Sequence, residues 1–310
     1  EKELTAIIKH SNDTYYNNNP IMTDNEHDII KEYAENKFPH NISIKDIGAP
    51  ISGDNKVNLP YFMASMDKIK PDTKALDNWK IKYTGPYVLT AKLDGISALY
   101  STENNTKKLY TRGNGSIGQD ISHLIPYLNL PNNDNITIRG ELIMKKKTFI
   151  DKYKDTAANS RNLVSGIVNS KKSGTPEKYN DIDFICYEVI KPSIKPSEQT
   201  TFLDIFVCNQ IHDNITNDYL SNLLITWRND YDYDIDGIIV TNDDIYDRTN
   251  KNPKHAFAFK MILSDQVVEA KVLDVLWTAS KHGYLKPRIR VEPVIIGGAT
   301  IEYATAFNAA

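Results

Sequence analysis

The chain has 310 residues, a hydrophobic fraction of 40%, a charged fraction of 25% and a formal net charge of −3, values typical of a soluble globular protein with two or three domains. No stretch of about 18 apolar residues is present, which argues against a transmembrane helix, and the absence of an apolar signal region argues against secretion. Cys186 and Cys208 form no Cys-x-x-Cys pair, which argues against a zinc site and a disulfide scaffold and fits a reducing compartment. Because the net charge is small, any nucleic-acid binding would have to come from local patches.

Residues 1–60 are predicted to form a helical unit followed by a linker. Thr23–Glu26 matches a capping box, with threonine at the N-cap and glutamate at N3. In the helix that follows, Asp24 and Asp28 would be neighbours on the surface. The simplest interpretation of Asp24 is that it complements the helix dipole. A polar connector, Asp46–Pro60, then separates this unit from the rest of the chain.

Short strands broken by polar turns are predicted from about residue 61. The strand that ends at Thr90–Gly95 places Lys92 and Asp94 on one face and apolar residues on the other. A lysine can act as a nucleophile if burial or neighbouring cations lower its pKa. The aspartate could orient that lysine, or bind a metal or a sugar hydroxyl. The alternative is an exposed strand end with an ion pair and a turn glycine, Gly95.

Gly113–Gly118 is a literal G-x-G-x-x-G, and Glu141 lies at about the distance beyond it that a dinucleotide fingerprint requires. The fingerprint also needs a parallel strand–helix–strand unit. Here the preceding strand, Lys108–Arg112, is predicted to be one arm of an antiparallel hairpin whose turn is Asn104-Asn105. We therefore reject the dinucleotide interpretation of this loop.

The next strand, Ile136–Met144, alternates between apolar residues on one face and Thr137, Arg139 and Glu141 on the other. Gly140 inside this strand indicates a close approach by backbone or ligand. A solvated sheet face would explain the polar residues equally well. Beyond it we predict, in chain order, a helical segment over 159–168, a strand over 183–189 with Ile185, Tyr187 and Val189 on one face, and helices near 202–210 and 219–228.

Two further strands, Asp234–Val240 and Ala256–Leu263, are predicted to be buried. In the second, four large apolar residues form the core face, and Ala256, Ala258 and Lys260 line the other face. A lysine on a buried strand is not expected to lie unpaired. We therefore expect a bound anion beside Lys260.

The remainder of the chain is predicted to be a separate all-β unit. Lys286, Arg288 and Arg290 alternate with apolar residues and form one cationic strand face. This face is either a solvated edge strand or a phosphate-contacting patch of an OB-type barrel. The stretch is short for a five-stranded barrel, so the chain is expected to continue beyond Ala310 or to have gaps.

In their order along the chain, these motifs resemble the NAD⁺-dependent DNA ligases of the nucleotidyltransferase superfamily. The motifs are Lys92-Leu93-Asp94-Gly95, Thr111–Gly115, Arg139-Gly140-Glu141, Ser160-Arg161-Asn162, Phe184–Tyr187, Ile235-Asp236-Gly237 and Phe259-Lys260. The richness in Asn, Tyr, Ile, Lys and Asp would suit a compact version from an AT-rich genome, such as that of a large DNA virus. The resemblance implies an α+β multidomain protein: a helical NMN-binding domain with linker (1–60), an antiparallel-sheet adenylation domain (61–264) and a partial OB-fold (265–310).

The resemblance also implies a ligase reaction in three steps, used in DNA replication and repair. Lys92 would attack the α-phosphorus of NAD⁺ and release nicotinamide mononucleotide (NMN), leaving a lysyl-AMP. AMP would then pass to the 5′-phosphate of nicked duplex DNA, and a 3′-hydroxyl would displace it. Mg²⁺ would assist, and Lys260, Arg161 and Mg²⁺ would lower the pKa of Lys92. The implied protein is a monomer without membrane association, in the cytoplasm or at a nucleoid or viral replication site.

The family's functional residues carry over onto matching positions of this chain. Lys92, Asp94 and Lys260 would be catalytic, and Lys286, Arg288 and Arg290 would contact DNA. The AMP half would be bound by Ser65, Met66, Arg112, Glu141 (ribose), Arg161, Tyr187 and Ile239 (adenine), Arg228 and Asp236. The nicotinamide half would be bound by Tyr15, Tyr16, Asp24, His27 and Asp28.

Some positions depart from the family's pattern. Thr90 replaces a glutamate beside adenine, Thr241 replaces a lysine, and Asn169 replaces a second arginine after Ser160-Arg161-Asn162. These departures motivate an alternative, a degenerate ligase that acts as a nucleic-acid-binding scaffold. Another alternative is an ATP-dependent polynucleotide ligase or a capping-type nucleotidyltransferase, although neither would need the N-terminal helical unit.

Overall fold

The computed structural model describes residues 30, 37–38, 56–71, 73–169, 176–204, 206–261, 268–279, 285–296 and 299–305. The capping box and the linker up to residue 55 lie outside the described residues. So do five of the predicted nicotinamide-binding residues, Tyr15, Tyr16, Asp24, His27 and Asp28. No helix in the described part of the chain is both long and apolar enough to cross a membrane.

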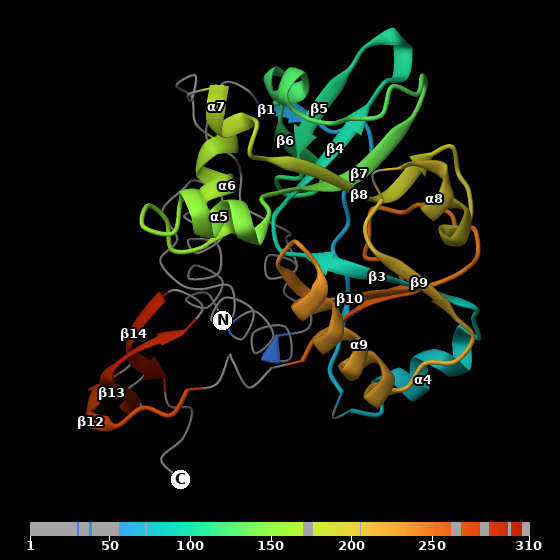
Figure 1. Ribbon diagram of the computed structural model, residues 1–310. Coiled ribbons are helices and arrows are strands. Elements are labelled where there is room, and N and C mark those ends of the chain that lie inside the picture. Colours follow the sequence, from blue (N-terminus) through green and yellow to red (C-terminus); the bar gives the residue numbers. More distant parts are fainter. Residues whose placement is uncertain are drawn as a thin grey trace.

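Two mainly antiparallel sheets form the body of the molecule (Figure 1). The five-stranded sheet has the order β2 (Lys68–Ile69), β11 (Ala256–Phe259), β10 (Ile235–Asn242), β3 (Tyr87–Leu93) and β9 (Asn209–His212). The four-stranded sheet has the order β5 (Lys108–Thr111), β4 (Ile96–Ser101), β7 (Thr137–Ile143) and β8 (Asp183–Lys191). Every pairing within these two sheets is antiparallel except β2 with β11.

Helices and two small sheets complete the described structure. The helices are α4 (Ala75–Lys82), α5 (Lys146–Lys152), α6 (Ser160–Asn169), α7 (Pro176–Tyr179), α8 (Pro196–Phe202) and α9 (Asn217–Asp230), with 3-10 turns η1 (Glu103–Asn105) and η2 (Ser122–Tyr127). A two-stranded sheet pairs β1 (Lys56–Asn58) with β6 (Ile117–Gln119). A three-stranded sheet contains β12 (Val272–Ala279), β13 (Leu285–Ile296) and β14 (Ala299–Thr305).

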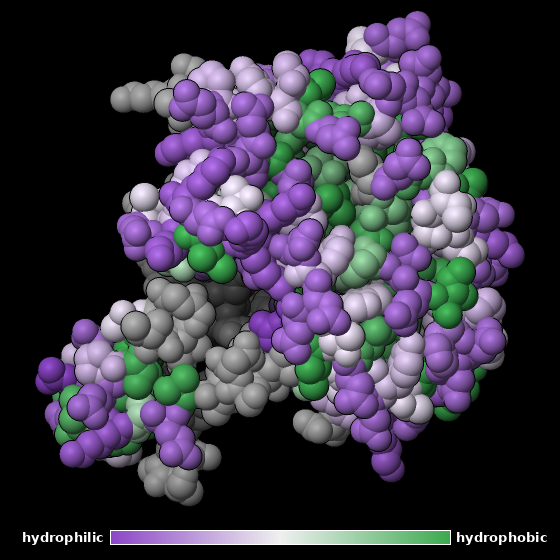
Figure 2. All heavy atoms as spheres, in the orientation of Figure 1, coloured by the Kyte–Doolittle hydropathy of each residue, from purple (hydrophilic) through white to green (hydrophobic). Residues whose placement is uncertain are grey.

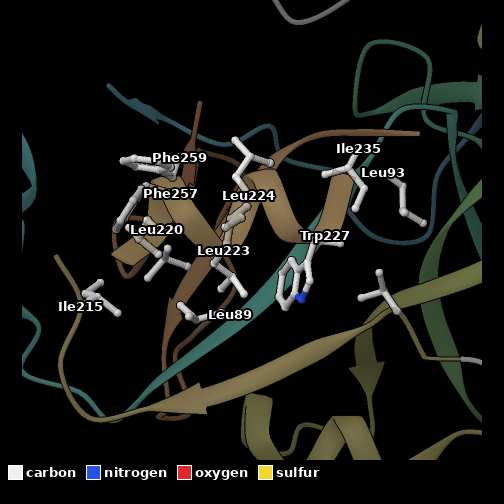
Figure 3. Close-up of a cluster of buried hydrophobic side chains, with 14 of the residues drawn as sticks. Leu89, Leu93, Ile215, Leu220, Leu223, Leu224, Trp227, Ile235, Phe257 and Phe259 are labelled. Atoms are coloured by element: carbon white, nitrogen blue, oxygen red, sulfur yellow. The ribbon is translucent and has the colours of Figure 1, made fainter. Parts of the chain in front are cut away.

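Helix α9 covers one face of the five-stranded sheet. The Thr216 hydroxyl caps its N-terminus by accepting a hydrogen bond from the Tyr219 amide at 3.1 Å. Its apolar residues recur at helical spacing and pack against the inward side chains of β3, β10 and β11 (Figure 3). The labelled residues of this core are Leu89, Leu93, Ile215, Leu220, Leu223, Leu224, Trp227, Ile235, Phe257 and Phe259. The side chains on the opposite face of the sheet, including Lys92, take no part in this core.

The four-stranded sheet has a core of its own, where it packs against α6 through Val164, Ile167 and Val168. Gly140 is part of this packing, because a Cβ there would lie 2.5 Å from the Phe184 ring and 2.7 Å from the Ile185 carbonyl oxygen. The predicted close approach at Gly140 is therefore confirmed, and it is made by the neighbouring strand.

The hairpin interpretation of the glycine-rich loop is also confirmed. β4 and β5 are antiparallel, and Asn104 and Asn105 form their turn with φ values of 55° and 57°. Gly113–Gly118 continues from β5 into β6, which forms an antiparallel ladder with β1, and no helix starts there. The loop therefore lacks the strand–helix geometry of a dinucleotide site.

Two predictions about local structure were wrong. The helix expected near residues 202–210 is α8, which begins at Pro196, because proline suits the first helical position and Glu198 accepts a hydrogen bond from the Lys195 amide at 3.0 Å. Residues 209–212 instead form the edge strand β9. Val189 does not share a face with Tyr187, because register shifts in the β7–β8 ladder reverse the alternation and bury Val189 with Phe184.

The predicted all-β unit after residue 267 is confirmed as far as its three antiparallel strands. β12 exposes apolar side chains, among them Val272, Leu273 and Trp277, on a surface that is otherwise largely hydrophilic (Figure 2). Its assignment as part of an OB-fold stays a prediction.

Candidate functional site

Two neighbouring strands and the residue that follows a third bring two lysines to one carboxylate; β11 ends at Phe259, earlier than predicted, and Lys260 comes directly after it. The β3–β10 ladder pairs Leu93 with Ile235 and Lys92 with Gly237, so Asp236 is an extra, bulged residue. Lys92 Nζ and Lys260 Nζ both contact Oδ2 of Asp236, the latter at 2.8 Å. Lys260 is therefore paired with a carboxylate of the protein itself, and the expected bound anion beside it stays a prediction.

Gly237 allows the strands to approach at this point. A Cβ on Gly237 would lie 2.5 Å from the carbonyl oxygen of Phe259 and 3.2 Å from Cγ of Lys260. Any larger residue would force β10 and β11 apart and move Lys260 away from Asp236. The Asp-Gly pair thus supplies both the charge and the space that the two amines need.

A second pair of contacts joins the start of α6 to the end of β3. Arg161 Nη1 donates to Oδ1 of Asp94 at 2.6 Å, and Ser160 Oγ donates to Oδ2 of Asp234 at 2.8 Å. The Asp94 amide also donates to the Asp234 carbonyl oxygen at 3.0 Å. Because α6 packs on the four-stranded sheet, these bonds connect that sheet to the strand that carries Lys92.

Glu141 lies on β7 and is buried. Burial raises its pKa to about 7, although the positive charges of Arg161, Lys92 and Arg112 act in the opposite direction. These three cations, from α6, β3 and the end of β5, therefore surround one carboxyl group. Gly95 gives it room, since a Cβ there would lie 2.9 Å from Cγ of Glu141 and 2.4 Å from the Leu142 carbonyl oxygen.

The pKa of Lys92 is raised above its ordinary value. Burial by itself lowers the pKa, and so does the charge of Arg161, but the charge and hydrogen bond of Asp236 together with the charge of Asp94 outweigh them. Conversely, burial favours protonation of Asp236, but the two lysines hold the pKa of Asp236 well below its usual range. Arg161 thus acts in the expected direction, but the net shift of the Lys92 pKa is upward because the Asp236 carboxylate contacts the amine, and the contribution of Mg²⁺ stays a prediction.

One of the two residues predicted to contact adenine, Ile239, lies on the same sheet face as Lys92. Ile239 pairs with Thr90 in the β3–β10 ladder, two residues along β3 from Lys92, so all three side chains share one face. The Tyr187 hydroxyl of β8 lies 2.5 Å from Oγ of Ser97 on β4. Their contact with a base stays a prediction.

Ser65 and Met66 are half-buried in the segment that connects β1 to β2. The segment is anchored before them, where the Met63 amide donates to the Gly115 carbonyl at 2.9 Å, and after them, where the Ala258 amide donates to the Asp67 carbonyl at 2.8 Å. Their backbone is therefore fixed between the glycine-rich turn and β11.

The remaining predicted residues lie farther along the chain. Arg228 is in the last turn of α9, the helix that packs on the opposite face of the five-stranded sheet, so its role in the nucleotide pocket stays a prediction. On β13, Arg288 and Arg290 are exposed while Val291 is buried, as the alternation predicted. The Arg288 guanidinium lies 4.2 Å from the centre of the Tyr303 ring. The side chain of Lys286 lies outside the described residues.

Ser160 and Asp234 also belong to the site, although neither was among the predicted site residues. Ser160 is the first residue of α6, and its hydroxyl contacts the carboxylate that enters β10. A signal was present in the Asp-Ile-Asp-Gly run at 234–237, which has two acidic residues two positions apart. In the structure these residues have different partners: Asp234 accepts from Ser160, and Asp236 contacts the two lysines. Their partners could not be assigned because they come from different parts of the chain.

Comparison with known proteins identifies a consistent set of relatives. Residues 62–263 match the family described as the NAD-dependent DNA ligase adenylation domain. A DNA ligase of Acanthamoeba polyphaga mimivirus is 42% identical over 324 residues, covering 99% of this chain and 50% of that protein. A DNA ligase of Clostridium botulinum (strain Alaska E43) is 28% identical, covering 99% of this chain and 53% of that protein.

Among solved structures, a Lig E DNA ligase superposes with a TM-score of 0.45 at 15% sequence identity, and the match covers 78% of this chain and 84% of that one. The chain spans about half the length of the curated relatives that it matches.

Proposed function

The chain belongs to the NAD-dependent DNA ligase adenylation-domain family, and we propose that it forms a lysyl-AMP on Lys92 from NAD⁺ and seals nicks in duplex DNA. One observation supports this most directly: Lys92, on β3, and Lys260, directly after β11, approach a single carboxylate, Asp236, from either side of β10. One amine can then serve as the nucleophile while the other remains a fixed cation beside it.

The proposed reaction has three transfers at phosphorus. First, Lys92 Nζ forms a P–N bond to the α-phosphorus of NAD⁺, the bond to the NMN phosphate oxygen breaks, and the Nζ proton passes to solvent. Second, the 5′-phosphate at the nick forms a bond to the adenylate phosphorus, and the P–N bond breaks to return Lys92. Third, the 3′-hydroxyl attacks the 5′-phosphate, AMP leaves, and the strand is sealed.

The charges around Lys92 suit the first transfer. An α-phosphate entering between the two amines would replace the contacts that Asp236 makes with them, so Asp236 holds its place until the substrate binds. Lys260 would then stabilise the charge that develops on the phosphate oxygens. Arg161, held by Asp94 at 2.6 Å, would supply a second fixed positive charge. The Lys92 amine still has to lose its proton before attack.

We propose that the remaining predicted residues bind the AMP half of NAD⁺. Glu141 would accept hydrogen bonds from the ribose, and Tyr187 and Ile239 would enclose the adenine. Arg112 and Arg228 would contribute positive charge to the pocket, and Ser65 and Met66 would complete its wall. The NMN half would be bound by the N-terminal residues Tyr15, Tyr16, Asp24, His27 and Asp28.

Mg²⁺ fits this site only as an ion that the substrate helps to bind. Among the described residues, no group of three or more histidine, cysteine or acidic side chains is placed to hold a metal ion. Mg²⁺ commonly uses one or two carboxylates together with substrate phosphates and water, and Asp236 is the carboxylate nearest the two amines. When bound, the ion would supply positive charge to the phosphates.

The adenylation step can be tested by intact-protein mass spectrometry. The chain is incubated with Mg²⁺ and either NAD⁺ or ATP in parallel reactions, and we expect one AMP moiety on Lys92 from NAD⁺ together with released NMN. Lys92→Ala should form no adduct, whereas Lys152→Ala, which removes an exposed lysine paired with Asp181, should behave like the wild type.

The other outcomes separate the alternatives. An adduct formed from ATP alone would indicate an ATP-dependent nucleotidyltransferase. Binding of a nicked duplex without any adduct, and without a difference between the wild type and Lys92→Ala, would indicate a nucleic-acid-binding scaffold.

A further inference from the structure

Three charged side chains outside the lysine site form a continuous chain of ion pairs. Arg139 Nη1 on β7 donates to Oε2 of Glu188 on β8 at 2.9 Å. Arg248 Nη1, from the segment after β10, donates to the other oxygen of the same carboxylate. Glu188 is therefore shared by two arginines that come from parts of the chain associated with different sheets.

Each arginine uses its second amino group to hold one segment of backbone. Arg139 Nη2 donates to the Ala64 carbonyl oxygen at 2.9 Å, and Arg248 Nη2 donates to the Phe62 carbonyl oxygen at 3.3 Å. We call residues 62–67 the strap. Its N-terminal half is thus fixed by two guanidinium groups that are themselves fixed by Glu188.

The other end of the strap is anchored as firmly. The Asp67 carboxylate accepts hydrogen bonds from Asn252 Nδ2 at 2.9 Å and from Lys254 Nζ at 2.7 Å. Ser65 and Met66 lie between the two anchored ends. Their position therefore depends on the two arginines and Glu188 at one end and on Asp67 at the other.

Arg139 also contacts Tyr187. Its guanidinium lies 5.5 Å from the centre of the Tyr187 ring, and only 6% of its side chain is exposed. Among the described residues, its buried Nε has no hydrogen-bond partner. A buried ion pair adds little net stability relative to apolar packing, and an unpaired buried N–H is costly. Stability alone therefore does not explain an arginine at this position.

We propose that Arg139, Glu188 and Arg248 form a clamp that positions the strap and the Tyr187 ring to bind the AMP half of the dinucleotide. The clamp residues are positioning residues, because they act through Ser65, Met66 and Tyr187. This inference rests on the proposed function. It predicts that loosening the clamp weakens dinucleotide binding and leaves the chemical step at Lys92 nearly unchanged.

Single-turnover adenylation over a range of NAD⁺ concentrations tests this prediction, because it separates half-saturation from the maximal rate. Arg248→Ala suits it best, since 36% of the Arg248 side chain is exposed and its loss should not prevent folding. We expect the half-saturating NAD⁺ concentration to rise about fivefold to tenfold, which corresponds to about 1–1.4 kcal/mol, with a maximal rate within about twofold of the wild type.

Two further variants and a control sharpen the result. Arg248→Lys should restore only part of the affinity, because an ammonium does not reproduce the forked contact with both Glu188 and the Phe62 carbonyl. Glu188→Gln should have the largest effect, since it leaves the buried Arg139 without its counter-charge. Lys152→Ala is the control. It removes the 2.7 Å ion pair between Lys152 and Asp181, which involves no residue of the strap or the clamp, and it should leave both the half-saturating NAD⁺ concentration and the maximal rate unchanged.

The outcomes are distinguishable. A wild-type chain that forms no adduct from NAD⁺ would overturn the proposed function and this inference with it. Normal wild-type adenylation, with half-saturation unchanged in Arg248→Ala and Glu188→Gln, would overturn the inference alone. A fall in the maximal rate at unchanged half-saturation would also overturn it, because the clamp would then act on the reacting groups and not on binding.

Discussion

At the scale of single residues, the two aspartates beside Lys92 decide its protonation. Asp236 hydrogen-bonds to the amine and Asp94 adds negative charge, so the pKa of Lys92 lies above its ordinary value despite burial. Nucleophilic attack requires the neutral amine. At neutral pH Lys92 is therefore an ammonium ion, which would have to lose a proton before the proposed adenylation.

The first prediction concerns the pH dependence of adenylation. Because the pKa of Lys92 is raised, the single-turnover rate should increase with pH between about pH 6 and pH 10. Asp236→Asn removes the main cause of the raised pKa and should move the profile to lower pH, even if the maximal rate falls. Arg161→Gln removes a charge that lowers the pKa and should move the profile in the opposite direction. Profiles that coincide in all three proteins would contradict this account.

The second prediction concerns Glu141 and stability. Its pKa is raised by burial to about 7 in the folded chain, from 4.5, so the folded state prefers the protonated carboxyl. The resulting stabilisation is fully present below about pH 4.5 and is lost as the pH rises through about 7. Glu141→Gln should therefore raise the free energy of unfolding at pH 8 by up to about 3 kcal/mol relative to the wild type, and by much less at pH 5.

Denaturant unfolding at the two pH values measures this difference. The same substitution should weaken adenylation if Glu141 binds the ribose, so stability and activity would change in opposite directions. Equal stability differences at both pH values would show that Glu141 is not buried as a charged group.

At the scale of elements, close strand contacts create the site. Glycines at 95, 140 and 237 stand where a Cβ would meet neighbouring backbone at 2.4, 2.7 and 2.5 Å respectively. Because Asp236 is a bulged residue, its carboxylate lies between Lys92 of β3 and Lys260 after β11. In a regular ladder this residue would be paired and its side chain would point to one face of the sheet. The chemistry at Lys92 thus depends on how three strands pair.

A matched pair of glycine substitutions tests the packing argument. Gly140→Ala should destabilise the chain by about 1–3 kcal/mol, because the new methyl group would overlap the Phe184 ring. Gly166→Ala lies on the exposed side of α6 with nothing within 4 Å of the added Cβ, and should stabilise the chain by about 0.5–1 kcal/mol through helix propensity. Thermal unfolding distinguishes the two, and shifts of the same sign would contradict the packing.

At the scale of the whole molecule, two groups of positively charged residues lie in different units: the lysine site in the two larger sheets, and the arginines of β13 in the three-stranded sheet. The lysine site lies where the five-stranded and four-stranded sheets are joined through Arg161 and Asp94. The exposed arginines of β13 belong to the three-stranded unit. We expect the lysine site to bind the nucleotide and the arginines of β13 to contribute contacts to the DNA backbone.

The fourth prediction separates these two roles. Arg288→Ala combined with Arg290→Ala should weaken binding to a nicked duplex and reduce the slope of log K against log salt concentration by about 2, since each phosphate contact contributes about 0.9. Lysyl-AMP formation from NAD⁺ should be unaffected. Fluorescence anisotropy across a salt series provides the measurement, with Lys152→Ala as the surface-charge control. An unchanged slope would show that this strand face is simply solvated.

Much of the local structure could be predicted because its causes are local. Side-chain alternation identified the faces of β3, β7 and β11, and the consecutive asparagines at 104 and 105 identified the β4–β5 turn. The helix near residues 202–210 was misplaced because apolar residues there, such as Leu203 and Val207, pack into the two cores from a non-helical segment that leads into β9. Periodicity over so few residues does not distinguish a helix from a strand.

The sequence alone predicts which residues carry the chemistry, because Lys92, Asp94, Glu141, Arg161, Asp236 and Lys260 all belong to motifs that follow one another along the chain. How these residues act on one another depends on the tertiary structure. It set the pKa of Lys92 above its ordinary value, and it joined Arg139, Glu188 and Arg248 around the strap. The physical reason is that Coulomb interactions depend on distance through space, and strand register, bulges and glycine contacts fix those distances between residues far apart in sequence.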